Sequence, residues 1–167
     1  MRNQVRVRAD GARRIDDAVR RAAEAESAYK DAVKEATLAL RDLNAEVKSS
    51  SLSVEEAEIG LERAKERLAE LKRVGTDNPL DLREAEVGVK RANLSLEEAR
   101  TRYRDVSREA AEANAVGVQG AKNVVAAQRG VEDANRAVAD AQRDSAEANA
   151  DAARQVTDAV EKLRDSY

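Results

Sequence analysis

The chain of 167 residues is 38% charged and 2% aromatic, with a net charge of −3, one proline and no cysteine, histidine, tryptophan or phenylalanine. This composition excludes disulfides, zinc sites built on cysteine or histidine, and Ser–His or Cys–His nucleophiles. The scarcity of bulky apolar side chains is typical of long helices and coiled coils rather than of a globular core.

The first nine residues differ from the rest of the chain. Val5 and Val7 alternate with arginines, which hints at a strand, but the chain offers no second strand to pair with it. We therefore predict an extended or frayed lead-in over residues 1–9, with Asp10 as the N-cap of the following helix. The lead-in has no apolar segment, so it is not predicted to be a secretory signal.

A heptad repeat predicts a first helix over residues 10–74. The hydroxyls of Ser49, Ser50, Ser51 and Ser53 compete for backbone groups, and Ser53 with Glu56 matches a capping box, which favours a break there. The heptad phase passes through unchanged, and we expect a continuous or gently distorted helix. The a positions are Val19, Glu26, Val33, Leu40, Val47, Val54, Leu61 and Leu68, and the d positions are Ile15, Ala22, Tyr29, Ala36, Leu43, Ser50, Ala57, Ala64 and Leu71.

A turn is predicted at residues 75–78. Gly75 supplies a left-handed C-cap, Asn78 an N-cap, and Pro79 suits the first helical position. Asp81 favours the positive end of the helix dipole. A connection this short requires the two helices to fold back antiparallel.

The second helix is predicted over residues 79–167. Gly117 and Gly120 fall in its core positions, at about 1 kcal/mol each relative to alanine. After Ala148 the apolar stripe shifts by a four-residue stutter, which locally unwinds a coiled coil. The a positions are Leu82, Val89, Leu96, Tyr103, Ala110, Gly117, Val124, Val131 and Val138, the d positions are Ala85, Ala92, Ala99, Val106, Ala113, Gly120, Ala127, Ala134 and Ala141, and the shifted stripe is Val156, Val160, Leu163 and Tyr167.

Together these patterns predict an all-α fold, a long antiparallel two-helix hairpin that forms a coiled coil with an alanine-rich heptad seam. The turn sets a register in which large residues face small ones, for example Leu61 opposite Ala92 and Ser50 opposite Tyr103. The N-terminal start of the first helix then lies opposite about Ala141 to Ala148, so we expect an overhang of the second helix from about residue 149.

Three residues on the stripe invite a functional interpretation. Glu26 is its one acidic residue, and we expect it to set the register or to reach outward to water rather than to form a site. Tyr29 and Tyr103 are predicted to fill the core with their hydroxyls at its edge. We accordingly predict no catalytic, cofactor-binding or metal-binding residue, no small-molecule substrate and no enzyme activity.

Charge is uneven along the chain, with arginines concentrated in residues 1–21 and acids in residues 131–167. An arginine cluster can bind nucleic acid. We favour the simpler interpretation that the basic start of one helix lies beside the acidic end of the other, so no specific nucleic-acid site is predicted. No apolar run approaches the roughly 20 residues that span a bilayer, so no stable membrane insertion is expected.

Two stretches resemble a known family. Residues 54–103 contain IGLERAKERLAEL, the Asn-Pro turn and LREAEV, and residues 117–142 contain GVQGAKNVVAAQ followed by VEDANRAVADAQ. They resemble the coiled-coil region of tail tape measure proteins from long-tailed phages of actinobacteria. The resemblance implies a fragment of a longer ruler and assembly scaffold. It would be assembled in the host cytoplasm, lie in the lumen of the virion tail, and contact tail tube and tail-assembly proteins.

Two other functions fit the pattern. A bacterial coiled-coil spacer or interaction module of an envelope or secretion protein would share the hairpin, whereas an amphipathic membrane-surface protein would need a bulkier apolar face. We also expect a homo-oligomer, a dimer or trimer of hairpins, that uses the overhang and a third small-residue stripe. That stripe comprises Ala18, Ala25, Ala32 and Ala39, flanked on the second helix by Val116, Asn123, Gly130 and Ala137.

Overall fold

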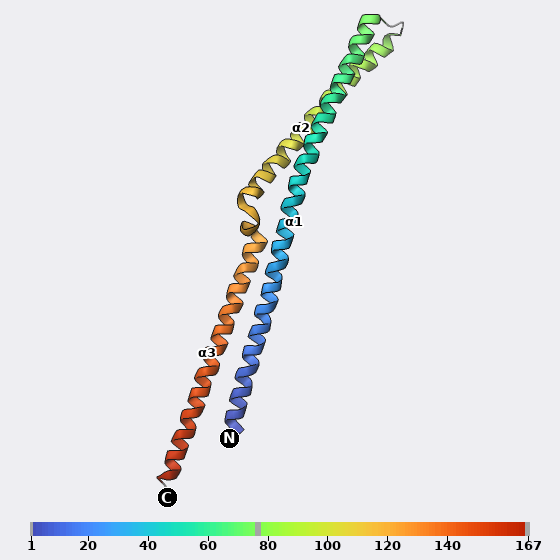
Figure 1. The fold of residues 1–167 in the computed structure, drawn as a ribbon. Coiled ribbons are helices and arrows are strands. Elements are labelled where there is room, and N and C mark those ends of the chain that lie inside the picture. The colour runs from blue at the N-terminus through green and yellow to red at the C-terminus, as the bar shows by residue number, and fades with distance from the viewer. Residues whose placement is uncertain (1, 76–77, 166–167) are drawn as a thin grey trace. The chain divides into compact units, whose positions relative to one another are not determined.

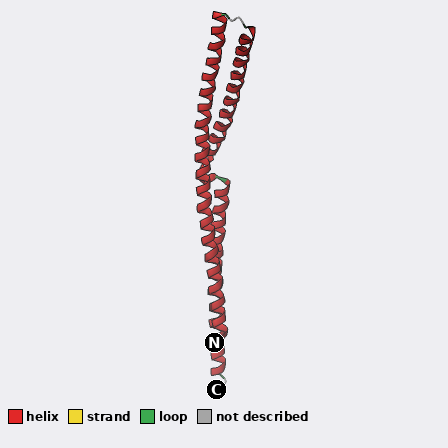
Figure 2. Ribbon diagram, turned by 90° about the vertical axis from the view of Figure 1, so that its right-hand side faces the viewer, coloured by secondary structure: helices red, strands yellow, loops and turns green. Residues whose placement is uncertain are grey.

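A computed structural model describes residues 2–75 and 78–165 of the chain, with side chains from residue 6 onward. It contains helix α1 (Arg2–Val74), helix α2 (Pro79–Gly120) and helix α3 (Lys122–Arg164) (Figure 1). No strand occurs within these described ranges (Figure 2). The prediction of an all-α helical hairpin is confirmed.

The chain divides into two compact units. Unit 1 combines Met1–Ala36 with Gln119–Tyr167, so it pairs the first half of α1 with α3. Unit 2 is the continuous segment Thr37–Val118, which pairs the second half of α1 with α2. Each unit is therefore a pair of helices, described below by itself.

Helix α1 begins earlier than the sequence predicted. Residues 2–9 are helical from Arg2, not extended or frayed, and Asp10 lies inside the helix instead of capping it. An isolated alternating run has no neighbouring strand to bond with, whereas an existing helix gains one backbone hydrogen bond for each residue added. Helix extension therefore prevails, while Met1 lies outside the described residues.

The serine cluster does not interrupt α1. The helix continues through Ser49–Ser53, and the Ser53 hydroxyl donates to the backbone oxygen of Ser49 at 3.1 Å. This bond to the preceding turn satisfies the hydroxyl without a change of backbone conformation. Ser53 therefore does not act as an N-cap, and the expectation of a continuous helix is confirmed.

The turn between α1 and α2 follows its local signals. Gly75 adopts φ +83° and its N–H donates to the oxygen of Leu71 at 3.1 Å, a left-handed helix end that glycine adopts without steric cost. Asn78 accepts the N–H of Leu80 at 3.1 Å, and Pro79 begins α2, so Asn78 is the N-cap. Residues 76–77 of the predicted turn lie outside the described residues.

The second helix is interrupted, contrary to the prediction of a continuous helix over residues 79–167. Gly117 has φ 67° and ψ 175°, a region that essentially only glycine adopts, and α3 restarts after Ala121. Two glycines within four residues weaken helix propensity enough for the backbone to depart there. Val124, with no exposed surface, follows directly and anchors the start of α3. Residues 166–167 lie outside the described residues.

Candidate functional site

The seam of unit 2 follows the predicted heptad. In α1 the least exposed positions are Ser50 and Leu61, and in α2 they are Ala85, Leu96 and Ala110. All five occupy predicted a or d positions. Alternation of leucine with serine and alanine lets the backbones approach closely while the leucines fill the remaining space. The apolar spacing therefore identified the packed face of these two segments.

Two ion pairs between α1 and α2 flank the middle of the unit 2 seam. The Arg100 guanidinium lies 2.6 Å from the Glu58 carboxylate, and that of Arg102 lies 3.0 Å from Glu46. All four side chains are about half exposed or more, so each pair contributes at most about 1 kcal/mol. The two ion pairs favour one alignment of α1 against α2, because sliding one helix along the other would break both of them.

An asparagine pair joins α1 and α2, and sequence reasoning missed it. The Asn114 amide donates to the Asn44 side-chain oxygen at 3.0 Å, and the Asn44 amide donates back at 3.4 Å. Each amide also donates to its own helix, at Leu40 and Ala110 respectively. The expected register brings these two asparagines near each other, so pairing polar residues as well as apolar ones would have found them. Such a pair fixes the register of two helices.

The seam of unit 1 lies on a different stripe of α1 than predicted. Ala18 is 8% exposed, whereas its neighbour Val19, a predicted a position, is 48% exposed. The buried face of α1 here combines the predicted d positions with Gly11, Ala18 and Ala32, each one residue before a predicted a position or its continuation. Of the predicted a positions of this segment, Val19 and Glu26 are exposed and are therefore wrong, whereas Val33 is half-buried. The packed stripe is rotated by about one residue at Val19 and Glu26.

The rotation bears on two further predictions. Glu26 is exposed, which agrees with the expectation that it reaches outward to water and leaves it no register-setting role inside the seam. Ala18 and Ala32, assigned to a third stripe for self-association, are buried within the single chain and do not form a free face. Removing a carboxylate from water is costly, and the rotation leaves Glu26 hydrated while placing small residues at the contact.

Close approach in unit 1 occurs at Gly11. A Cβ atom placed there would lie 2.5 Å from the Ser145 hydroxyl oxygen and 3.2 Å from the Ser145 Cβ, so only glycine fits without adjustment. Further along, the Tyr29 hydroxyl donates to the side-chain oxygen of Gln119 at 3.1 Å while its ring is half-buried. Tyr29 is thus a core filler with its hydroxyl at the edge, as predicted. Tyr103 is not, because it is 38% exposed.

The end of α3 carries an exposed apolar stripe. Val156, Val160 and Leu163 are 43%, 58% and 63% exposed. Ala152 is half-buried and residues 153–165 are exposed, so the overhang starts about four residues later than predicted. Tyr167, the fourth member of the predicted stripe, lies outside the described residues.

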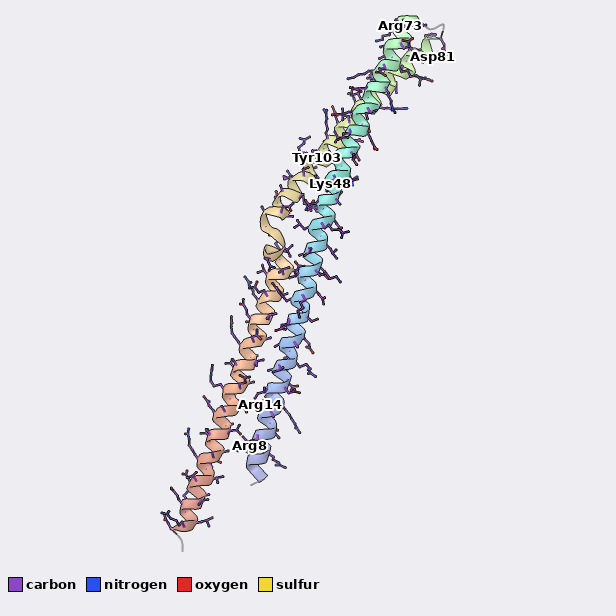
Figure 3. The ribbon with its side chains drawn as sticks, viewed as in Figure 1. Arg8, Arg14, Lys48, Arg73, Asp81 and Tyr103 are labelled. Atoms are coloured by element: carbon purple, nitrogen blue, oxygen red, sulfur yellow. The ribbon has the colours of Figure 1, made fainter. Side chains whose placement is uncertain are left out.

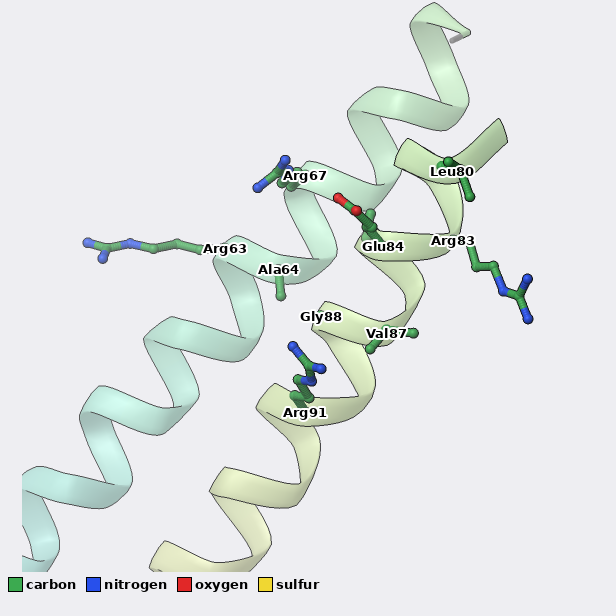
Figure 4. A pocket seen from close by; sticks show the side chains of 10 residues that line it. Arg63, Ala64, Arg67, Leu80, Arg83, Glu84, Val87, Gly88 and Arg91 are labelled. Atoms are coloured by element: carbon green, nitrogen blue, oxygen red, sulfur yellow. The ribbon is translucent and has the colours of Figure 1, made fainter. Parts of the chain in front are cut away.

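A groove near the turn of unit 2 is lined by several arginines, but their guanidinium groups do not point to a common position. It is lined by Arg63, Arg67, Arg83 and Arg91 together with Glu84. Figure 4 shows the side chains of Arg63 and Arg83 extending in opposite directions, away from the groove. A single anion cannot bridge guanidinium groups that diverge, and Glu84 opposes it electrostatically. Charged side chains elsewhere radiate around the helices in the same way (Figure 3).

Within the described part of the chain, no group of three or more potential ligands is placed to hold a metal ion. Among the same residues, no helix is both long and apolar enough to cross a membrane. The chain matches no family model, no curated protein and no solved structure.

Proposed function

We propose that the helix pairs are antiparallel coiled coils and that the chain is a structural spacer, in the manner of a phage tail ruler. In an antiparallel coiled coil the flanking positions of like type face each other across the seam. Glu58 and Arg100 both follow a d position, and Glu46 and Arg102 both precede an a position. Asn44 and Asn114 also both follow a d position. These like-with-like pairs support an antiparallel arrangement.

The observation that carries a spacer function is the uninterrupted length of α1. Its 73 residues give a helix contour of about 110 Å at about 1.5 Å per residue. Buried or half-buried residues of α1 recur from Gly11 to Leu71, so α1 is packed against a partner helix in both units. Most of the stability of a long helix comes from packing against partner helices, which an isolated helix of this composition lacks.

The experiment for a ruler is a matched heptad deletion in the parent phage gene. Removing residues 54–60 together with 93–99 takes one heptad from each helix and preserves the phase of both seams. Tail length measured by electron microscopy should fall in proportion to the number of heptads removed. A control deletion of four residues from α1 alone breaks the phase and should impair assembly rather than shorten tails. Unchanged tail length with normal assembly would contradict the ruler function.

The second candidate is a spacer or interaction module in a bacterial envelope or secretion protein. It is favoured by the same α1 contour and by the interhelical ion pairs, neither of which is specific to a tail. Neighbouring genes distinguish the two functions. Tail tube and tail chaperone genes support the ruler, whereas an operon of envelope proteins supports the alternative.

Self-association through the overhang completes the proposal. Val156, Val160 and Leu163 recur at helical spacing on α3 and remain exposed in the single chain. Truncation after Ala152 removes this stripe and spares the half-buried contacts with α1. We expect sedimentation velocity to show weaker association for the truncated chain, with unchanged helicity per remaining residue. A full-length chain that sediments as a monomer at high concentration would contradict self-association.

A further inference from the structure

The packed face of α1 changes between its two units. One packed row, from Ile15 to Ala64, continues through both units at seven-residue spacing. The other row does not. In unit 1 it consists of small residues, which we call the small row: Gly11, Ala18, Ala25 and Ala32. In unit 2 it lies one residue further along, which is about 100° around the helix, at Leu40, Val47, Val54 and Leu61.

The second helix, by contrast, keeps its heptad count through the break between α2 and α3. Ala110, Gly117, Val124 and Val131 follow one another at seven-residue spacing, and all four are buried or half-buried. In one continuous helix they would form a single row. The backbone at Gly117 (φ 67°, ψ 175°) and at Ala121 (φ −59°, ψ 135°) instead interrupts the helix. The spacing of the packing residues therefore does not require the break.

The break and the change of row in α1 occur together. Both fall at the boundary of the units, after Ala36 in α1 and after Val118 in the second helix. Two straight helices pack in register only when both keep the seven-residue repeat. A continuous second helix would therefore need a row of α1 that reaches Leu40 at this spacing. That row exists beside the small row, and we call it the heptad row: Val19, Glu26 and Val33.

We propose that unit 1 is a two-state switch in which the second helix is either broken or continuous. In the broken state, which the structure shows, the small row is packed while Val19 and Glu26 are exposed. In the continuous state residues 117–121 are helical and α3 packs on the heptad row. Helix α1 remains one helix in both states, so the switch rotates its packed face by about 100°. The switch belongs to the single chain and does not depend on the proposed spacer function.

Opposing contributions separate the two states. The continuous state buries Val19 more fully and restores helical hydrogen bonds at the break. Against it, two glycines become helical and the Glu26 carboxylate leaves water. Glycine adopts φ 67° without steric cost, so Gly117 makes the broken state accessible. Glu26 and Gly117 are thus the two residues that hold the switch in the broken state.

Cysteine labelling distinguishes the two rows, because the chain has no cysteine of its own. Ala18→Cys reports on the small row and Val19→Cys on the heptad row. The native residues are 8% and 48% exposed, so in the broken state a maleimide should label Val19→Cys at least about fivefold faster than Ala18→Cys. In the continuous state this order is reversed.

Two substitutions in the full chain act on the switch. Glu26→Leu removes the charge that opposes burial of the heptad row, and Gly117→Ala removes the backbone conformation that the break requires. We expect each to lower the ratio of the Val19→Cys rate to the Ala18→Cys rate by about threefold or more, and the two together to bring it below one. Circular dichroism verifies that each variant remains helical.

Matched controls separate switching from a general loosening of unit 1. Glu35→Leu removes an exposed carboxylate of α1 outside both rows, and Gly130→Ala replaces a helical glycine of α3 that has open space around it. Both should leave the labelling ratio unchanged, and a shift in either control equal to that of its counterpart would contradict the switch.

The outcome that overturns the inference is a helical double variant in which Val19→Cys still reacts faster than Ala18→Cys. Glu26→Leu provides an independent test, because it alters only an exposed side chain and leaves the break and the packed rows of the broken state intact. If Gly117→Ala unfolds the chain, an unchanged labelling ratio in Glu26→Leu alone also overturns the switch.

Discussion

Ala18 and Val19 provide the sharpest test of where the interface of unit 1 lies. The heptad read from sequence places Val19 in the seam and Ala18 beside it, whereas the structure buries Ala18 and exposes about half of Val19. We therefore compare Ala18→Val with Val19→Ala, which change the same two methyl groups at adjacent positions. The structure predicts that the first variant is the more damaging.

The magnitudes follow from burial. Removing two carbons from Val19 costs about 1.6 kcal/mol at full burial and about 0.8 kcal/mol at half burial, and the better helix propensity of alanine returns about 0.6 kcal/mol. Val19→Ala should therefore be nearly neutral. Ala18→Val forces two carbons into a closed contact at a cost of about 1–3 kcal/mol, and the loss of helix propensity adds about 0.6 kcal/mol.

Urea denaturation followed by circular dichroism at 222 nm measures both free energies of unfolding. Ala12→Val is the matched control, because Ala12 is exposed on the same helical segment and should lose only about 0.6 kcal/mol of propensity. If Val19→Ala destabilises the chain more than Ala18→Val does, the rotated seam is wrong and the simple heptad is correct.

Three further substitution pairs test the fold. Leu96→Ala, at a side chain 6% exposed, should cost about 2–4 kcal/mol in urea denaturation, whereas Leu94→Ala, 57% exposed, should cost less than about 0.5 kcal/mol; equal losses would contradict the α2 seam. Gly117→Ala should destabilise the chain by about 1–3 kcal/mol because alanine does not adopt φ 67°, ψ 175°, and helical Gly130→Ala, with open space around it, should stabilise by about 1 kcal/mol; a gain at Gly117 would show that the break is not required. Asn78→Ala should lower the thermal midpoint through a loss of about 1 kcal/mol, and Asn78→Asp should retain most of it; an unaffected Asn78→Ala variant would mean that the cap is dispensable.

Local signals were sufficient to predict the turn. Gly75 provides φ > 0, Asn78 provides a side-chain acceptor, and Pro79 provides a fixed φ, and each acts within two or three residues. No distant partner is needed for any of them. For the same reason the end of α1 at Val74 and the start of α2 at Pro79 agree with the predicted boundaries.

The start of α1 and the break before α3 were not decided locally. Residues 2–9 offer a weak strand pattern and a weak helix pattern, and extension of an existing helix selects the latter. Gly117 and Gly120 were predicted to destabilise the helix, but this loss of helix propensity does not by itself say whether the helix continues through both glycines or breaks at one of them. The structure places the departure at Gly117.

By itself the sequence determined an all-helical chain, its reversal at residues 75–78, and the packed faces of unit 2, because each depends on spacing or on contacts within a few residues. Only the tertiary structure decided which stripe of α1 packs in unit 1. Ala18 and Val19 belong to equally regular seven-residue stripes, so periodicity cannot choose between them. Packing against α3 decides between them. The close approach of the two helices at Gly11 favours the stripe of small residues that contains Ala18, and this orientation of α1 leaves Glu26 in water.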